Sequence, residues 1–114
     1  MSRLLSCAAF FLLMAGTPAS ADYQAGLDAY EQGKYRTAMK QWRAVVDEPP
    51  SEETQPYYSE SLYAIAMLYW QGEGVRQSHS KSVKWLNRAA GRRHAGAQAK
   101  LGYLYTEGVG VQQD

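Results

Sequence analysis

The segment IAMLYWQGEGVRQ, residues 65–77, is repeated near the end of the chain as LGYLYTEGVGVQQ, residues 101–113. Identical residues occur at one fixed offset of 36 positions. They are Leu68 and Leu104, Tyr69 and Tyr105, Gly72 and Gly108, Gly74 and Gly110, Val75 and Val111, and Gln77 and Gln113. Repeats with a period of about 20 to 50 residues are typical of arrays of stacked structural units. The sequence therefore predicts a repeat architecture.

Each copy has the spacing of an amphipathic helix. One stripe at i, i+3, i+4 and i+7 contains Leu62, Ile65, Ala66 and Tyr69, and its counterpart contains Gln98, Leu101, Gly102 and Tyr105. We expect the small residues Ala66 and Gly102 to let a neighbouring helix approach closely. The tyrosines at 69 and 105 should then fill the far end of the same seam.

The paired glycines predict how each helix ends. Gly72 and Gly108 follow the helix where a left-handed residue is favoured, and Gly74 and Gly110 give the returning chain a second unrestricted φ. Val75 can then anchor the chain in the core. Phosphate-binding loops instead follow a strand and open a helix. The pattern therefore gives no support to a nucleotide site, and no cofactor is expected.

A second helix, about residues 80–90, should end at Gly91 and return an apolar face beside Trp85, made of Val83, Leu86, Ala89 and Ala90. The whole stretch 72–111 resembles the Sel-one-like repeat, a relative of the tetratricopeptide repeat with a longer loop between its helices. The matching residues are Gly72, Gly74, Val75, Lys81, Trp85, Ala89, Ala90, Gly91, Ala95, Ala97, Leu101, Gly102, Tyr105, Gly108, Gly110 and Val111. Ser78 stands where that family usually has an aspartate, and Ser82 replaces a usual alanine.

Upstream, AYEQGKY at residues 29–35, followed by Ala38 and Trp42, looks like a tetratricopeptide-type hairpin with a shorter turn. We therefore expect an all-α fold, an α/α solenoid of about two and a half tetratricopeptide or Sel-one-like hairpins. Its predicted parts are an N-terminal hairpin at 22–47, a Pro- and acid-rich connection at 48–58, a Sel-one-like repeat at 59–94 and an incomplete one at 95–114. The helix after the connection should start between Gln55 and Ser59.

The first 21 residues predict a secretory signal peptide, with Arg3 before an apolar centre and an Ala-Ser-Ala site at 19–21. That centre is shorter than the roughly 20 residues that span a membrane. We expect cleavage before Asp22, no membrane insertion afterwards, and a periplasmic or secreted protein. The sole cysteine, Cys7, would leave with the signal, so no disulfide is expected.

The charge balance and the reactive residues argue against nucleic-acid binding, metal binding and catalysis. Without Arg3 the chain has equal numbers of basic and acidic side chains, and no basic excess or stripe of the kind that nucleic-acid binding requires is evident. His79 and His94 are expected to be exposed imidazoles, with no cysteine or histidine partner for a metal. No nucleophile, base and oxyanion site can be assembled. Neither catalytic nor metal-binding residues are predicted, so we do not expect an enzyme.

Binding fits better, because stacked hairpins place their first helices along a concave surface. The predicted partner is a protein or peptide, held by an aromatic face with an acidic end. The candidate contacts are Asp28, Glu31, Tyr63, Met67, Trp70 and Tyr103. Packing between the units is the competing explanation for the four aromatic and methionine positions.

The sequence stops at Asp114, where a further helix should begin. We expect the last helix to expose Leu104 and its apolar neighbours, and therefore a contact through this helix in a longer array, a dimer or a complex. The resemblance implies an exported scaffold for protein–protein interaction in envelope regulation or assembly. The alternatives are an exported enzyme that acts on cell-wall or β-lactam substrates, and a fragment of a larger secreted repeat protein.

Overall fold

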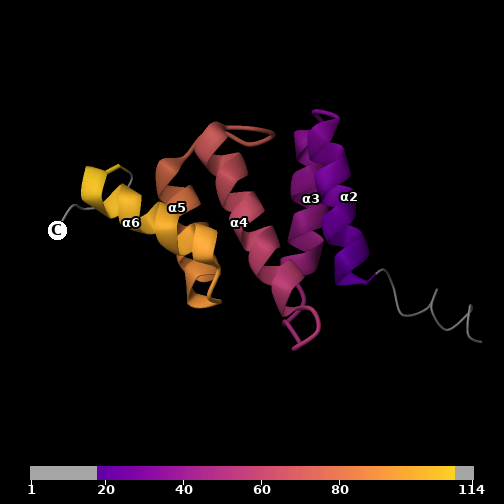
Figure 1. Ribbon diagram of the computed structural model, residues 1–114. Helices are drawn as coiled ribbons and strands as arrows, with labels where there is room; N and C mark the ends of the chain where they lie inside the picture. Colours follow the sequence, from indigo (N-terminus) through magenta and orange to yellow (C-terminus); the bar gives the residue numbers. More distant parts are fainter. Residues whose placement is uncertain (1–17, 110–114) are drawn as a thin grey trace, which may run out of the picture.

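The computed structural model describes residues 18–109, and this part of the chain is helical without strands. Its helices are α2 (Ala19–Glu31), α3 (Tyr35–Val46), α4 (Gln55–Gln71), α5 (His79–Gly91) and α6 (Ala95–Glu107). Consecutive helices pack against each other as hairpins, and α4 joins the hairpin α2–α3 to α5 (Figure 1). The all-α solenoid prediction is confirmed.

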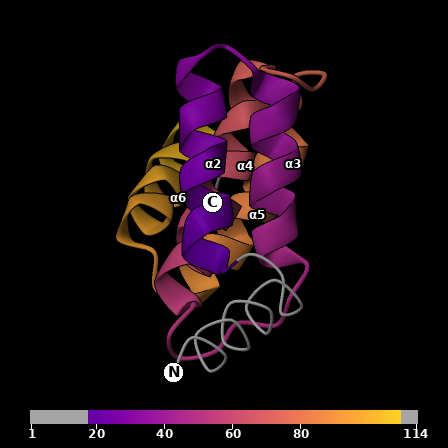
Figure 2. The ribbon, with the colours of Figure 1, turned by 90° about the vertical axis from the view of Figure 1, so that its right-hand side faces the viewer.

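The helices form two layers. Figure 2 shows α2 and α6 on one side of the array and α3 and α5 on the other. Helix α4 packs against α2, α3 and α5. We call α2, α4 and α6 the first layer, since α2 and α4 each open a hairpin and α6 lies on the same side as α2, and α3 and α5 the second layer.

Proline and glycine set the helix ends. Helix α4 begins at Gln55 with Pro56 in its first turn, within the predicted range, because proline already has a helical φ and its missing N–H is not needed there. Helix α2 begins at Ala19, so the last three residues of the predicted signal form its first turn. The rest of that predicted segment, residues 1–17, and Gly110 lie outside the described residues, and the cleavage site remains a prediction.

The predicted glycine turns are confirmed where they are described. Gly72 and Gly108 have φ of 73° and 69°, and their N–H groups donate to the carbonyl oxygens of Leu68 and Leu104. Gly74 also has a positive φ, 74°. A Cβ on Gly74 would lie 2.8 Å from the carbonyl carbon of Tyr35, so glycine is needed there both for its conformation and for close contact with α3.

One continuous core runs through all the described helices. Its larger members are Trp42, Tyr58, Leu62, Ile65, Leu68, Leu86, Leu101 and Leu104, with Ala66 fully buried among them as predicted. Ser82 is also buried, and its hydroxyl donates to the carbonyl oxygen of Ala66 at 2.7 Å. This bond explains how a serine is accommodated at a position where the family usually has alanine.

Three expectations for α6 are wrong, those for Leu104, Gly102 and Tyr105. Leu104 is completely buried, whereas Gly102 is exposed and a Cβ there would meet nothing within 4 Å. Helix α6 packs through Ala97, Leu101 and Leu104, a stripe rotated from the expected one, because α5 lies on that side. The exposed side of α6 instead presents Tyr103 and Tyr105, at 58% and 39% exposure.

None of the helices in residues 18–109 is long and apolar enough to cross a bilayer.

Candidate functional site

A cleft of about 270 Å³ lies between the first hairpin and α4. On α2 it is lined at i, i+4 and i+7, and on α4 at i, i+3, i+4 and i+7, so one stripe of each helix faces it. The lining residues are Tyr23, Leu27, Tyr30 and Trp42 from the hairpin, and Glu60, Tyr63, Ala64 and Met67 from α4. The cleft is thus largely aromatic and apolar, with one carboxylate at its side.

The structure brings together only part of the predicted contact set. Tyr63 and Met67 are half-buried and line the cleft. Asp28 and Glu31 are exposed on α2 but do not line it, and Asp28 accepts a hydrogen bond from the Gln24 side chain at 2.9 Å. The stripe of α2 that faces the cleft lies one residue earlier than expected, about 100° around the helix. The binding role of these residues remains a prediction.

The other two predicted contacts lie on the α4–α6 side. The half-buried Trp70 ring stacks on His79, with centroids 3.9 Å apart, and the Lys100 ammonium lies 4.6 Å from the Trp70 centroid. Tyr103 is exposed beside the same lysine, at 5.9 Å. Trp70 therefore already packs against residues of both α5 and α6. This agrees with the alternative explanation from the sequence, in which Trp70 packs between the units.

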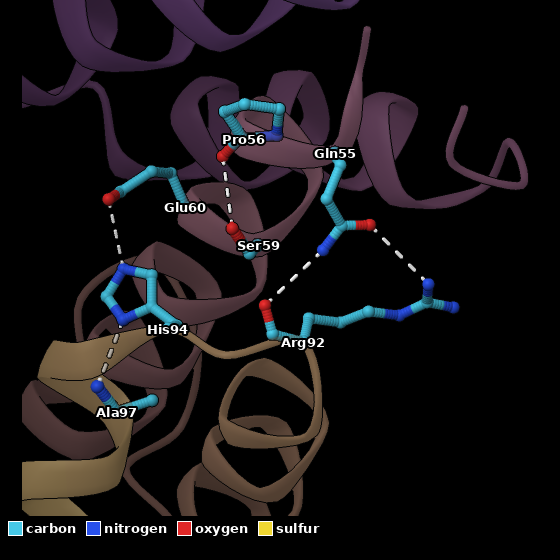
Figure 3. A network of polar contacts seen from close by, with 7 residues as sticks. All are labelled: Gln55, Pro56, Ser59, Glu60, Arg92, His94 and Ala97. Carbon is cyan, nitrogen blue, oxygen red and sulfur yellow. Dashed lines mark hydrogen bonds and ion pairs between the residues drawn. The ribbon is translucent and has the colours of Figure 1, made fainter. Parts of the chain in front are cut away.

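Neither histidine is an exposed imidazole, contrary to the sequence prediction. His79 is half-buried under Trp70. The His94 side chain is only 10% exposed and stacks on Tyr63, with centroids 4.6 Å apart and planes 17° from parallel. Nδ1 accepts a hydrogen bond from the Ala97 N–H at 3.0 Å and caps the start of α6 (Figure 3). Nε2 lies 3.1 Å from Oε1 of Glu60, without an aligned hydrogen bond. Histidine is not among the residues that usually cap a helix, so this role could not be predicted from the sequence.

The turn that ends in His94 is held at a second point. The Gln55 side chain donates to the carbonyl oxygen of Arg92 and accepts from its guanidinium, at 3.4 and 3.5 Å (Figure 3). The same guanidinium lies 5.2 Å from the Tyr58 ring centroid. The start of α4 is thereby tied to the α5–α6 turn, which fixes the last described helix relative to the cleft.

The Glu73 carboxylate joins α2 to the α4–α5 loop. The Tyr30 hydroxyl donates to Oε1 of Glu73 at 2.9 Å, and this bond raises the pKa of Tyr30 above 10.0. The same carboxylate also raises the pKa of Tyr35, because it accepts a hydrogen bond from the Tyr35 hydroxyl. A phenolate beside a carboxylate is disfavoured, so both tyrosines stay neutral to higher pH. Tyr30 is thus held at the edge of the cleft.

Charge is segregated between α2 and α4 on one side and α3 and α5 on the other, whereas α6 contains one cation and one acid. The sequence expectation of no basic stripe is wrong. Helices α2 and α4 contain four acidic residues and no Lys or Arg, whereas α3 and α5 contain six cations and no Asp or Glu. The nearly equal numbers of acidic and basic residues in the whole chain do not reveal this division, because acidic and basic helices follow one another in the sequence. Within residues 18–109 no group of three or more His, Cys, Asp or Glu side chains is placed to hold a metal ion.

Comparison with protein families identifies the second part of the chain. Residues 59–94 and 95–114 each match the family model of the Sel1 repeat. These ranges contain α4 from Ser59 onward, α5 and α6, together with both glycine turns. Sel1 repeats are helical repeats that generally mediate protein–protein interaction and are typically non-catalytic. Residues 59–94 and 95–114 are therefore identified as Sel1 repeats.

Proposed function

We propose that this protein is an exported scaffold that holds a segment of a protein partner in the cleft between α2 and α4. The observation that carries the proposal is the lining of the cleft, which includes three tyrosines and two large aliphatic side chains: Tyr23, Tyr30, Tyr63, Leu27 and Met67. Aromatic side chains have few rotatable bonds and large contact areas, so they are favoured anchors in recognition surfaces.

The size of the cleft favours a side chain over a free small molecule. Its volume of about 270 Å³ is below the roughly 300–1,000 Å³ of typical small-molecule sites. One or two large apolar side chains of a bound segment would fill it. Glu60 is about half exposed at its edge, so a Lys or Arg beside the apolar anchor in the partner would meet a carboxylate.

Site-specific photocrosslinking tests this assignment. A photoreactive amino acid at Ala64, inside the cleft, should capture one defined partner in intact cells of the native host. Met67→Glu places a charge in the cleft and should abolish that crosslink. Tyr103→Glu adds the same charge at the exposed side of α6 and should leave the crosslink intact. Equal capture by wild type and Met67→Glu would exclude the cleft as the binding site.

We place this scaffold in the bacterial periplasm or outside the cell, in the regulation or assembly of the envelope. The support is the charged, apolar and small-residue order of residues 1–21. Mass spectrometry of protein expressed with its own leader should find an N-terminus at Asp22 in the exported fraction. An uncleaved chain that stays in the cytoplasm would refute this location without affecting the cleft.

A further inference from the structure

The second layer carries a charged surface that the cleft does not use. We call it the basic face. Its six cations are all exposed and occur at spacings of three or four residues along each helix. Side chains at such spacings lie on one side of a helix. The basic face consists of Arg36, Lys40 and Arg43 on α3, and Lys81, Lys84 and Arg88 on α5.

The two rows of cations meet at Trp85. The guanidinium carbon of Arg43 lies 5.2 Å from the Trp85 ring centroid, and that of Arg88 lies 4.6 Å from it. One ring thus attracts a guanidinium from each helix. Arg88 is further fixed by a hydrogen bond from Nη2 to the Tyr58 hydroxyl at 3.2 Å. Guanidinium groups held in this way lose less freedom when their remaining N–H groups bind an anion.

The basic face has no internal counter-charge. In the part of the chain that the structure describes, the ion pair present joins His94 to Glu60, and the cations of the basic face have no carboxylate within 4.0 Å. Like charges three or four residues apart disfavour a helix. An anionic group bound across the two rows would relieve this repulsion.

We propose that the basic face binds a short acidic segment of a protein. The short length of this segment is inferred from the carboxylates that lie at the two ends of the row of cations on α3. The Glu73 loop packs against Tyr35 at one end, and Asp47 and Glu48 follow the helix at the other. Along the α3 row, a long polyanion such as nucleic acid would meet these carboxylates, whereas a short segment fits between them.

The surroundings of the cations also disfavour a membrane as the occupant. Basic helices that lie on a bilayer present large apolar side chains beside their cations. The exposed large hydrophobic residues in 18–109 are Tyr30, Tyr103 and Tyr105, and all three belong to the first layer. Trp85, which lies among the cations, is half-buried and has a guanidinium of Arg43 and of Arg88 over its ring. Direct pairing of carboxylates with guanidinium and ammonium groups is the chemistry that this surface offers.

Fluorescence anisotropy with the full-length protein tests the proposal. The probe is a fluorescein-labelled oligoglutamate peptide, titrated at physiological ionic strength. Lys40→Gln combined with Lys84→Gln removes one exposed cation from each row and should raise the Kd about three- to tenfold. Lys100→Gln removes a cation of the first layer and should leave the Kd unchanged. Circular dichroism checks that each variant keeps its helices.

Three results would overturn the proposal. The first is equal peptide affinity of wild type and the double variant. The second is tighter binding of a single-stranded oligothymidine of equal charge, or of phosphatidylglycerol vesicles, than of the peptide. The third is self-association in sedimentation velocity that the double variant abolishes, which would make a second copy of the chain the occupant. The cleft variant Met67→Glu should bind the peptide normally, so this test is independent of the cleft.

Discussion

The His94 cap offers the sharpest test of how the repeats are joined. Replacement of His94 by Ala removes the acceptor for the Ala97 N–H and the ring that stacks on Tyr63. Loss of an N-cap costs about 1 kcal/mol, and an aromatic pair contributes about 1 kcal/mol. We therefore expect His94→Ala to lower the free energy of unfolding by about 2 kcal/mol.

Urea denaturation followed by circular dichroism measures this loss, and thermal unfolding should show a fall in Tm of about 10 °C for a domain of this size. His94→Asn is the matched control. Its side-chain oxygen can cap α6 as the imidazole does, but it cannot stack on Tyr63, so about half of the loss should be recovered.

Hydrogen exchange gives a second readout, because α6 packs mainly on α5 and can open without the rest of the array. In His94→Ala the amides of Leu101 and Leu104 should exchange faster, while those of α2 and α3 stay protected. A stability within about 0.5 kcal/mol of wild type, or identical behaviour of the Ala and Asn variants, would refute the role assigned to this imidazole.

Three further changes probe the fold and its electrostatics. Gly74→Ala should lower the free energy of unfolding in urea by about 2 kcal/mol or more, since it combines a positive φ with a clash against the α3 backbone, whereas Gly91→Ala, which clashes with nothing, should raise it by about 0.5 kcal/mol. Glu73→Gln should bring the pKa of Tyr30 down toward 10.0, measured by phenolate absorbance. Because that pKa is raised in the folded protein, the stability that the Tyr30 hydroxyl contributes is present below pH 10.0 and is lost as the pH rises further. The free energy of unfolding in urea should therefore fall less at alkaline pH in the variant than in the wild type. Ser82→Ala should cost about 1 kcal/mol or less by the same denaturation assay, because one hydrogen bond is lost and a small apolar group replaces it.

The helices and their glycine turns could be predicted because their causes are local. A left-handed residue after a helix favours glycine, although Arg93 has this conformation after α5, so the repeated spacing of Gly72 and Gly108 located two helix ends directly. The rotation of each helix about its own axis has no local cause. It depends on which neighbour the helix meets, and an error of one residue turns a stripe by about 100°. This explains why Asp28 was expected near the cleft and Leu104 on the surface.

The cap and the basic face were missed for a different reason. His94 is unremarkable in sequence until α4 and α6 are placed side by side, when Tyr63 and Glu60 come within reach. Net charge over the whole chain likewise hides a division that follows the layers. Adding the charges of each predicted helix separately would have revealed the basic face, since α3 and α5 contain cations and no acids.

Tyr63 belongs to both the cleft and the joint between the repeats. It lines the cleft, and it also stacks on the imidazole that caps α6. A substitution at Tyr63 would therefore change both the contacts with a partner and the stability of α6. A loss of binding in such a variant could not be attributed to one of these two causes. Met67 lines the same cleft and is not a contact of the His94 imidazole, so a charge placed there leaves the cap intact; because Met67 also packs against the core, circular dichroism must show that Met67→Glu stays folded. Binding that survives Met67→Glu but fails in His94→Ala would place the partner on α6 instead of in the cleft.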